Sequence, residues 1–416
     1  MNACAWRGLD LSYRQGFLRA SRQDKRKLAL FCHEALLENA LFPSSSFSLS
    51  FFMVEQISCI VSGNVKPACM GVSRTSSLDV MKCFAAFGVV WIHFGSGWLS
   101  PITRCAVPIF FVITGYYYPM MVEKGNLWRH IRKLLVMVLC SSALYGVVEV
   151  QHMIRHDTFQ EWISNTFKLR PILRMIAYDY DLFAMHLWYF YAVLYDLVIF
   201  YFADKWKLTK YLQYAALLLL FLFFIGNFAP WYMKLRNFLF MGLPCMMIGR
   251  LVGEKKDFVF SFLARKQYLL LYTSIFLFLI VIEMAVYNSL YGGLGIREMF
   301  IFTLPFILPW FYWALRNPTF GEESVFATIG RKYSAYIYIF HILATRLLSH
   351  IVEWDTPLLS RVIYPFLIFG ISLCMAWLFA KMMQWCKARF KLYNHFPSLG
   401  KMVASYNIFI SQIVYR

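Results

Sequence analysis

Apolar runs separated by short polar segments are the main feature of the chain from residue 78 onward. Ten such runs approach the length of about 20 residues that an α-helix needs to cross a lipid bilayer. Their approximate ranges are 78–98, 105–122, 134–154, 185–203, 211–229, 236–253, 268–288, 298–315, 333–350 and 362–385. The pattern predicts an all-α, polytopic membrane protein with about ten transmembrane helices.

The first run carries three ionisable side chains, Asp79, Lys82 and His93. An α-helix places Lys82 and His93 on one stripe, about 16 Å apart along the axis, with Asp79 about 40° from it. Ionisable groups at membrane depth are costly and usually face a protein interior or a wet cavity. Two interpretations remain open. The stripe lines a polar passage, or Lys82 snorkels to the interface while His93 makes one interhelical hydrogen bond.

The composition supports a membrane protein, because 60% of the 416 residues are hydrophobic and 15% are charged. The formal net charge is +19, but the basic residues form short clusters between apolar runs. This is the pattern of cytoplasmic membrane loops, so we exclude nucleic acid as a partner and expect membrane lipid or a polyanionic substrate. The ten cysteines show no metal-ligand spacing, and we expect neither a disulfide framework nor a metal site.

Lysine and arginine are more frequent in alternate loops, for example in 124–133 and 250–266. These loops are therefore expected to be cytoplasmic, which places both termini in the cytoplasm and makes 391–416 a basic cytoplasmic tail. Residues 1–69 have no convincing span and are expected to be an N-terminal extension, with Met70 as a candidate true start. The expected membrane domain is 70–390.

Six motifs follow one another along the chain from Arg74 onward. They are Lys82 eleven residues before His93; FFVITGY at 110–116, with Gly115; Arg129 and Arg132; HLWYF at 186–190, with Trp188; Arg236 followed by GLPCMMIG; and IYIFH, with Tyr338 and His341. Together they resemble the integral-membrane acyltransferase-3 family, bacterial acyl-CoA-dependent O-acyltransferases of cell-surface glycans. Two positions depart from the family pattern, which more often has Arg at 82 and Ser at 114.

The resemblance implies a membrane O-acyltransferase of the bacterial inner membrane. Its donor would be a cytoplasmic acyl-CoA, most often acetyl-CoA, and its acceptor a hydroxyl of a surface or lipid-linked glycan. The catalytic candidates are His93, as general base or acyl carrier, and Lys82. Arg129 and Arg132 would bind the donor, because paired guanidinium groups suit phosphates. Further candidate site residues are Asp79, Arg74, His341, Tyr338, Trp188 and Gly115, and His341 is equally well interpreted as an interhelical hydrogen-bond donor.

A transporter or flippase for a polar glycan or lipid-linked substrate would also use a polar passage. No internal two-fold repeat is apparent in the sequence, which counts against this alternative. The acceptor is not fixed either, since a lipid headgroup or a small antibiotic would offer the same hydroxyl chemistry. The loop 155–184, which contains several aromatic and charged residues, is the best candidate for the rim of an acceptor site, and it is equally well interpreted as ordinary packing at the membrane interface.

Overall fold

A computed structural model describes residues 75–94, 99–227, 235–254, 266–291, 297–349 and 362–395. These residues form helices and their connections, without a β-strand among them. The predicted N-terminal extension, Arg74 and residues 396–416 of the predicted basic tail lie outside the described residues. The all-α prediction is therefore confirmed for the part of the chain that the structure describes.

The helices follow one another along the chain with short connections. They are α4 Ser76–Phe94, α5 Ser100–Thr103, α6 Ala106–Glu123, α7 Leu127–Arg155, α8 Phe159–Thr166, α9 Leu169–Tyr178, η2 Met185–Leu187, α10 Trp188–Lys205, α11 Thr209–Asn227, the π-helical turn η3 Phe238–Gly242, α12 Leu243–Glu254, α13 Lys266–Tyr291, α14 Thr303–Arg316, α15 Val325–Lys332, α16 Ser334–Ser349 and α17 Tyr364–His395.

Within the described residues, seven segments are long and apolar enough to cross a membrane. They are Ser76–Phe94, Pro101–Glu123, Leu127–Arg155, Met185–Lys205, Thr209–Gly226, Tyr268–Leu290 and Tyr364–Trp385, and each coincides with a predicted span. The other three predicted spans correspond to α12, α14 and α16, which have 12, 14 and 16 residues and are shorter than a full crossing. Ten spans and the orientation of the termini therefore stay predictions.

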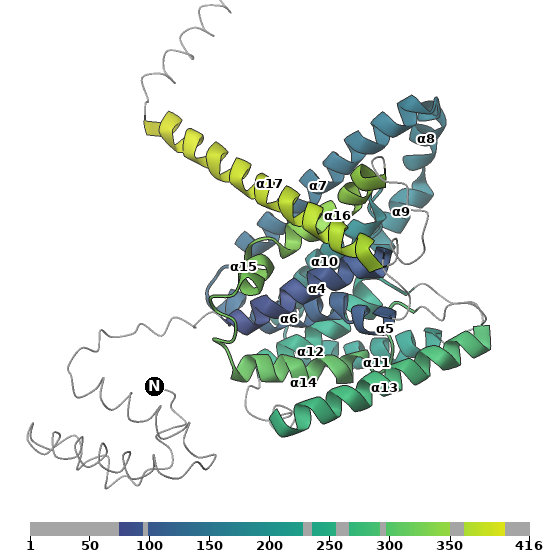
Figure 1. The fold of residues 1–416 in the computed structure, drawn as a ribbon, viewed down its shortest axis with the longest axis vertical. Helices are drawn as coiled ribbons and strands as arrows, with labels where there is room; N and C mark the ends of the chain where they lie inside the picture. The colour runs from purple at the N-terminus through teal and green to yellow at the C-terminus, as the bar shows by residue number, and fades with distance from the viewer. Residues whose placement is uncertain are drawn as a thin grey trace, which may run out of the picture. The chain divides into compact units, whose positions relative to one another are not determined.

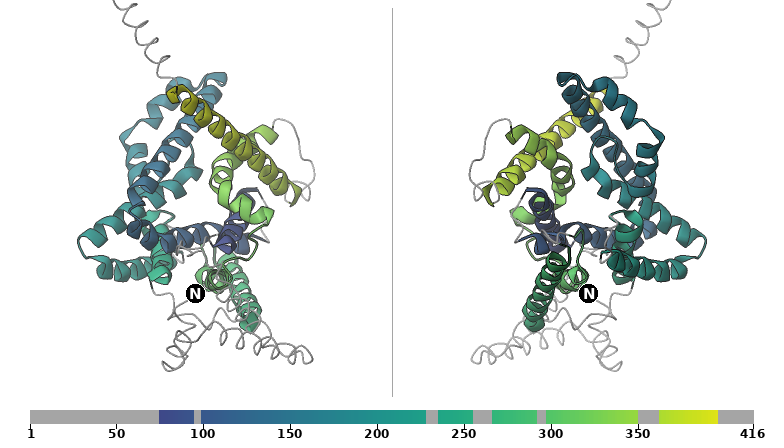
Figure 2. Two further views of the ribbon diagram at one scale, coloured as in Figure 1. Left: turned by 90° about the vertical axis from the view of Figure 1, so that its left-hand side faces the viewer. Right: turned by 90° about the vertical axis from the view of Figure 1, so that its right-hand side faces the viewer.

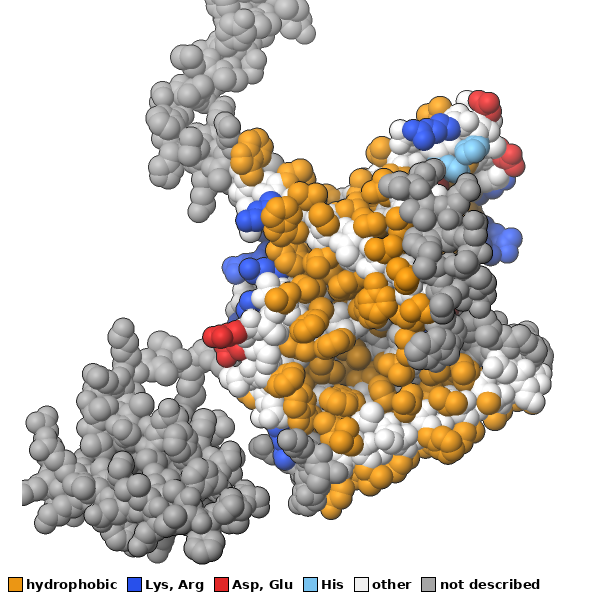
Figure 3. Space-filling view, in the orientation of Figure 1, with side chains coloured by type: hydrophobic (Ala, Val, Ile, Leu, Met, Phe, Trp, Pro, Cys, Tyr) orange, Lys and Arg blue, Asp and Glu red, His pale blue; other side chains and the backbone are white. Residues whose placement is uncertain are grey.

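The outer surface is that of a protein surrounded by lipid. Large apolar side chains stand more than half exposed on three of the long helices, for example Phe221 on α11, Leu270 on α13 and Phe366 on α17. Apolar side chains cover most of the face shown in Figure 3. A water-soluble protein rarely exposes so continuous an apolar surface, so this is a multi-pass membrane protein.

Helix α4, which carries the predicted polar stripe, lies in the middle of the packing (Figure 1). It packs against α6 on one side and against α15, α16 and α17 on another, while α12 lies beyond α6. Figure 2 shows the same succession from two further sides. Close contact with α15 depends on Gly330, where an added Cβ would lie 1.8 Å from the backbone oxygen of Asp79.

Helices α6 and α12 cross with their backbones in close contact. An added Cβ on Gly115 would lie 1.9 Å from the backbone oxygen of Met246, and one on Gly249 would lie 2.0 Å from that of Val112. Small residues at helix crossings let backbones approach in this way in membranes. Gly115, a candidate site residue from the sequence, thus packs α6 against α12.

Two buried carboxylates support helix ends near the connections. Glu283 of α13 accepts hydrogen bonds of 2.9 Å from the backbone N–H of Ile301, just before α14. Asp179, in a left-handed conformation with φ of 60°, accepts one of 2.5 Å from the N–H of Phe238 at the start of η3. Burial raises the pKa of Asp179 to about 7, although the Phe238 N–H acts in the opposite direction.

Arg250 of α12 is the centre of a second polar network. Its guanidinium forms ion pairs of 2.7 Å with Asp204 and with Glu254, and it lies 4.9 Å from the ring centre of Tyr118. The Tyr118 hydroxyl also donates to Asp204 over 2.7 Å. Because the arginine side chain is buried, these contacts compensate a charge that would otherwise be costly at this depth.

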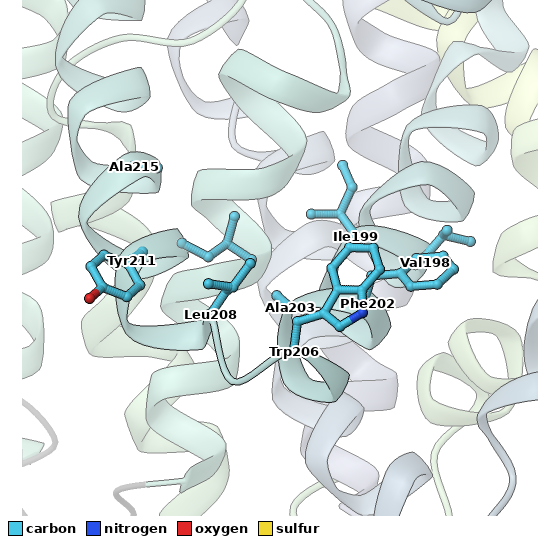
Figure 4. A pocket seen from close by; sticks show the side chains of 9 residues that line it. Val198, Ile199, Phe202, Ala203, Trp206, Leu208, Tyr211 and Ala215 are labelled. Atoms are coloured by element: carbon cyan, nitrogen blue, oxygen red, sulfur yellow. The ribbon is translucent and has the colours of Figure 1, made fainter.

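An apolar groove of about 480 Å³ lies between α10 and α11 near this network (Figure 4). Its lining consists of Val198, Ile199, Phe202, Ala203, Trp206, Leu208, Tyr211, Leu212 and Ala215. Such a lining suits apolar chains but offers no acid, base or nucleophile. The groove therefore belongs to the lipid-facing surface and not to a reaction centre.

Candidate active site

Three histidines from distant parts of the sequence come together beside the C-terminal end of α4. The ring of His93, in the last turn of α4, has its centre 5.2 Å from that of His341 on α16. The ring of His186, in η2, lies 5.1 Å from His341 on another side. His93 is exposed, whereas His341 is fully buried. One accessible imidazole is therefore backed by two less accessible ones.

Tyr338 holds both of the histidines that lie behind His93. Its backbone oxygen is 2.7 Å from Nδ1 of His341, and its hydroxyl donates to the backbone oxygen of His186. A carbonyl oxygen is an acceptor, so Nδ1 of His341 carries the proton and Nε2 presents the lone pair of the neutral ring. The bond stays within α16, and Nε2 has no partner within the described residues. His341 is thus not the interhelical donor that the sequence left open.

An ion-pair cluster adjoins the histidines. Glu298 bridges Arg104, at 3.1 Å, and Arg236, at 3.4 Å. The Arg236 guanidinium also lies 5.2 Å from the ring centre of Trp188. These three charged side chains act electrostatically on His93, and two arginines against one glutamate make its surroundings cationic.

A cavity of about 850 Å³ borders the same region. It is lined by Asn165, Thr166, Pro171, Arg174, Tyr178, Tyr180, Asp181, Leu182, Phe183, Met185 and Leu235. Met185 and Leu235 directly precede His186 and Arg236, and the Arg236 guanidinium lies 6.0 Å from the ring centre of Tyr180. Most of this lining comes from the loop 155–184 that the sequence indicates as a rim, so the loop does enclose space next to the histidines.

Lys82 and Asp79 lie toward the opposite end of α4 from His93. The Lys82 ammonium is 3.1 Å from a carboxylate oxygen of Asp79 and 5.5 Å from the ring centre of Tyr117. Since α4 is one continuous helix, the rise of about 1.5 Å per residue separates Lys82 from His93 by about 16 Å. The structure therefore does not bring the two predicted catalytic residues together.

Arg129 and Arg132 occupy the first turns of α7, and both are exposed. Arg129 forms no ion pair among the described residues, and its guanidinium donates a hydrogen bond of 3.0 Å to the side-chain oxygen of Asn126. Their spacing of three residues puts them on neighbouring positions of one helix face. The two guanidinium groups are thus available to an anionic ligand.

His186 is the residue of this cluster that the sequence did not single out as a candidate. It begins the HLWYF motif, but its ring meets His341 across 155 positions of sequence, and hydrophobic periodicity carries no information on such a pairing. The motif itself is the signal that could have identified it. Chemically, the cluster offers a base that a ligand can reach, acceptor nitrogens behind it and cations beside it, as acyl transfer requires.

Comparisons with known proteins agree with this chemistry. The Acyl_transf_3 family model, described as an acyltransferase domain, matches residues 75–381. Neither the curated proteins nor the solved structures compared with the chain gave a match. The match covers most of the chain and includes all three clustered histidines, and the protein therefore belongs to the acyltransferase-3 family of membrane acyltransferases.

Proposed function

We propose that the protein transfers an acyl group, most often acetyl, from acyl-CoA to a hydroxyl of a surface or lipid-linked glycan. The observation that carries this proposal is the exposed His93 imidazole, which lies 5.2 Å from the His341 ring and in the electrostatic field of Arg104, Arg236 and Glu298. The membrane is the bacterial inner membrane, and the chain crosses it about ten times with both termini in the cytoplasm. The predicted domains are kept: an extension 1–69, a membrane domain 70–390 and a basic tail 391–416.

The donor binds from the cytoplasmic side. Arg129 and Arg132 supply two exposed guanidinium groups on one helix face, and phosphates of a coenzyme are suited to such forks of donors. Lys82 and the partly buried Asp79–Lys82 pair lie on the α4 stripe between this end and His93. Lys82 therefore guides the donor, and Arg74, which lies outside the described residues, stays a candidate site residue from the sequence.

The acceptor binds in the cavity next to the histidines. Tyr178 and Tyr180 stack with ring centres 6.5 Å apart, and both line the cavity. Aromatic faces pack against sugar rings, while Arg174 and Asn165 offer hydrogen bonds to hydroxyl groups. A saccharide fits this mixture of aromatic and polar lining better than a lipid headgroup or a small apolar molecule.

In the first route, the acyl group passes directly from the donor to the acceptor. The acceptor oxygen bonds to the acyl carbon while its proton passes to His93, and the C–S bond breaks with its electron pair going to sulfur. The thiolate then takes up a proton, so that free coenzyme is released. In the second route, a His93 nitrogen bonds to the acyl carbon and the C–S bond breaks with its electron pair going to sulfur. The acceptor oxygen then bonds to the acyl carbon, the C–N bond breaks with its electron pair returning to His93, and another base takes the hydroxyl proton.

His93→Ala tests the proposal in purified protein in lipid nanodiscs, with acetyl-CoA and a panel of neutral and acidic oligosaccharides. Thiol release that depends on the acceptor should fall by about 10²–10⁴-fold, the usual worth of general acid–base catalysis. His152→Ala is a matched control, because His152 is exposed on α7 and its ring lies 4.5 Å from that of His156, outside the cluster. A loss below tenfold for His93→Ala in correctly inserted protein would refute the catalytic assignment.

The alternative function is a transporter or flippase for a polar glycan. It predicts movement of a labelled oligosaccharide across proteoliposomes without consumption of acyl-CoA. If His93→Ala retained thiol release but abolished such movement, the alternative would replace the acyltransferase proposal.

A further inference from the structure

The buried face of the histidine cluster contains a hydrogen-bond acceptor without a donor. His341 is fully buried, its Nδ1–H is committed to the Tyr338 backbone oxygen, and its Nε2 has no partner within the described residues. A buried polar atom without a partner costs about 1–3 kcal/mol, so such an atom needs a reason. With Nδ1 as the donor, Nε2 of the neutral ring can act only as an acceptor.

His93 is the donor that fits this acceptor. Its ring lies 5.2 Å from that of His341, centre to centre, and it makes no hydrogen bond within the described part of the chain. At this spacing, a rotation of the exposed His93 ring or one bridging water joins the two nitrogens. His186 lies equally close to His341, but the hydrogen bond of its ring with the backbone of Ile339 and the Tyr145 ring 4.7 Å away restrict its freedom to turn.

We propose that His341 is the positioning residue for His93. By accepting the N–H of one His93 nitrogen at Nε2, His341 fixes the tautomer in which the other His93 nitrogen directs its lone pair at the acceptor hydroxyl. When His93 takes the hydroxyl proton, both of its nitrogens carry hydrogen, and the bond to His341 stabilises the imidazolium. This inference rests on the proposed function and adds a residue that never touches the substrate.

Three substitutions at His341 separate positioning from packing. His341→Asn retains an amide N–H for the Tyr338 oxygen but places nothing at the position of Nε2. His341→Gln places an amide oxygen near the position of Nε2, and His341→Phe preserves the shape of the ring without either nitrogen. If His341 has only a structural role, His341→Asn should retain activity. If His341 positions His93, the kcat of His341→Gln should exceed that of His341→Asn and of His341→Phe.

The measurements are kcat, KM for acetyl-CoA and the pH dependence of kcat, in nanodiscs. We expect kcat to fall at least tenfold for Asn and Phe, with KM for acetyl-CoA within twofold and with partial recovery in Gln. The acid limb of the profile should move to lower pH in Asn and Phe, because the bond that stabilises the His93 imidazolium is gone. Arg104, Arg236, Glu298 and His186, the other charged and titratable groups facing His93, are unchanged in all variants.

Wild-type kcat in Asn, or equal rates for Asn and Gln in folded protein, would overturn the inference. If the variants do not fold, the solvent isotope dependence of wild-type kcat decides: a curved proton inventory, with two protons in flight, supports positioning, and a linear one refutes it. His152→Phe is the control for a ring substitution elsewhere. Because these tests leave His93 intact, their failure is distinguishable from failure of the proposed function, which His93→Ala reports.

Discussion

The two polar clusters inside the helix packing differ in how completely they are partnered. In the Arg250 network, two carboxylates, a tyrosine hydroxyl and two aromatic rings surround one guanidinium, and among the described residues Nη1 alone of its nitrogens lacks a hydrogen bond. In the histidine cluster, Nε2 of His341 and Nε2 of His186 are both buried and have no hydrogen-bond partner within the described part of the chain. The comparison indicates that a network that stabilises the fold pairs nearly all of its polar atoms with one another. The cluster that we propose for the reaction instead leaves two imidazole nitrogens unpaired within the described residues.

The largest effect that would test this comparison is expected for Arg250→Ala. Removing the guanidinium leaves Asp204 and Glu254 without their ion-pair partner, and breaking a buried pair in this way costs about 3–5 kcal/mol. Little folded protein should survive extraction, as measured by size-exclusion chromatography and thermal denaturation in detergent. Arg316→Ala, on an exposed arginine of α14, should behave like the wild type. Normal stability of Arg250→Ala would remove the contrast between the two clusters.

A pH dependence of stability is expected from Asp179. Burial raises its pKa in the fold to about 7 from the ordinary value of 3.8, so the folded state binds more protons than the unfolded state between these values. The contribution to stability is complete below 3.8 and is lost as pH rises through about 7, at up to about 1.4 kcal/mol per pH unit. Asp179→Asn retains an acceptor for the Phe238 N–H and should make the denaturation temperature less dependent on pH between pH 5 and 8. An unchanged slope would contradict the assignment.

Arg129→Ala and Arg132→Ala should weaken donor binding without affecting folding, since both side chains are exposed. Loss of one charge-assisted hydrogen bond costs about 1.5–3 kcal/mol, or about 10–150-fold in the dissociation constant of acetyl-CoA. Lysine at either position should recover part of the loss, because the charge returns without the planar fork. Arg331→Ala, at another exposed arginine, serves as the control. Equal affinities for acetyl-CoA in all three alanine variants would mean that Arg129 and Arg132 only fix the orientation of the chain in the membrane.

The smallest effect concerns Lys207, which adopts a φ of 57° just after α10. Its backbone N–H donates to Asp204 over 3.1 Å, and the next N–H donates to Ala203 over 2.7 Å, in the manner of a left-handed helix end. Glycine adopts this conformation without strain, so Lys207→Gly should stabilise by roughly 0.5–1 kcal/mol. Lys205→Gly, inside the last turn of α10, should instead destabilise, and the two denaturation temperatures must move in opposite directions.

Much of the helical framework could be predicted from the sequence, because burial in lipid demands long apolar runs. The run 78–98 predicts α4, and with it the shared stripe of Lys82 and His93. The shorter helices α12, α14 and α16 were harder, since apolar composition does not reveal where a helix ends inside a protein interior. Their role as full crossings stays a prediction.

The site was predictable only in part. His93, His341, Tyr338 and Trp188 do gather in one region, while Asp79 and Lys82 lie elsewhere on α4. Periodicity places a residue on a helix face but does not say which distant helix that face meets. The pairing of His341 with His186 and the closing of Glu298 on two arginines depend on that packing, so no pattern along the chain gives them.

The π-helical turn Phe238–Gly242 sets the angular register between the active site and the helix crossing. Arg236 precedes this turn and reaches the histidine cluster, whereas Gly249 follows it and meets α6. A wide turn contains one residue more than an α-helical turn, and each residue of an α-helix rotates the following face by about 100°. Deleting one residue of the turn would restore a regular helix and rotate the residues before the turn relative to those after it. Either Arg236 would rotate away from Trp188, or Gly249 would lose its close backbone contact with α6.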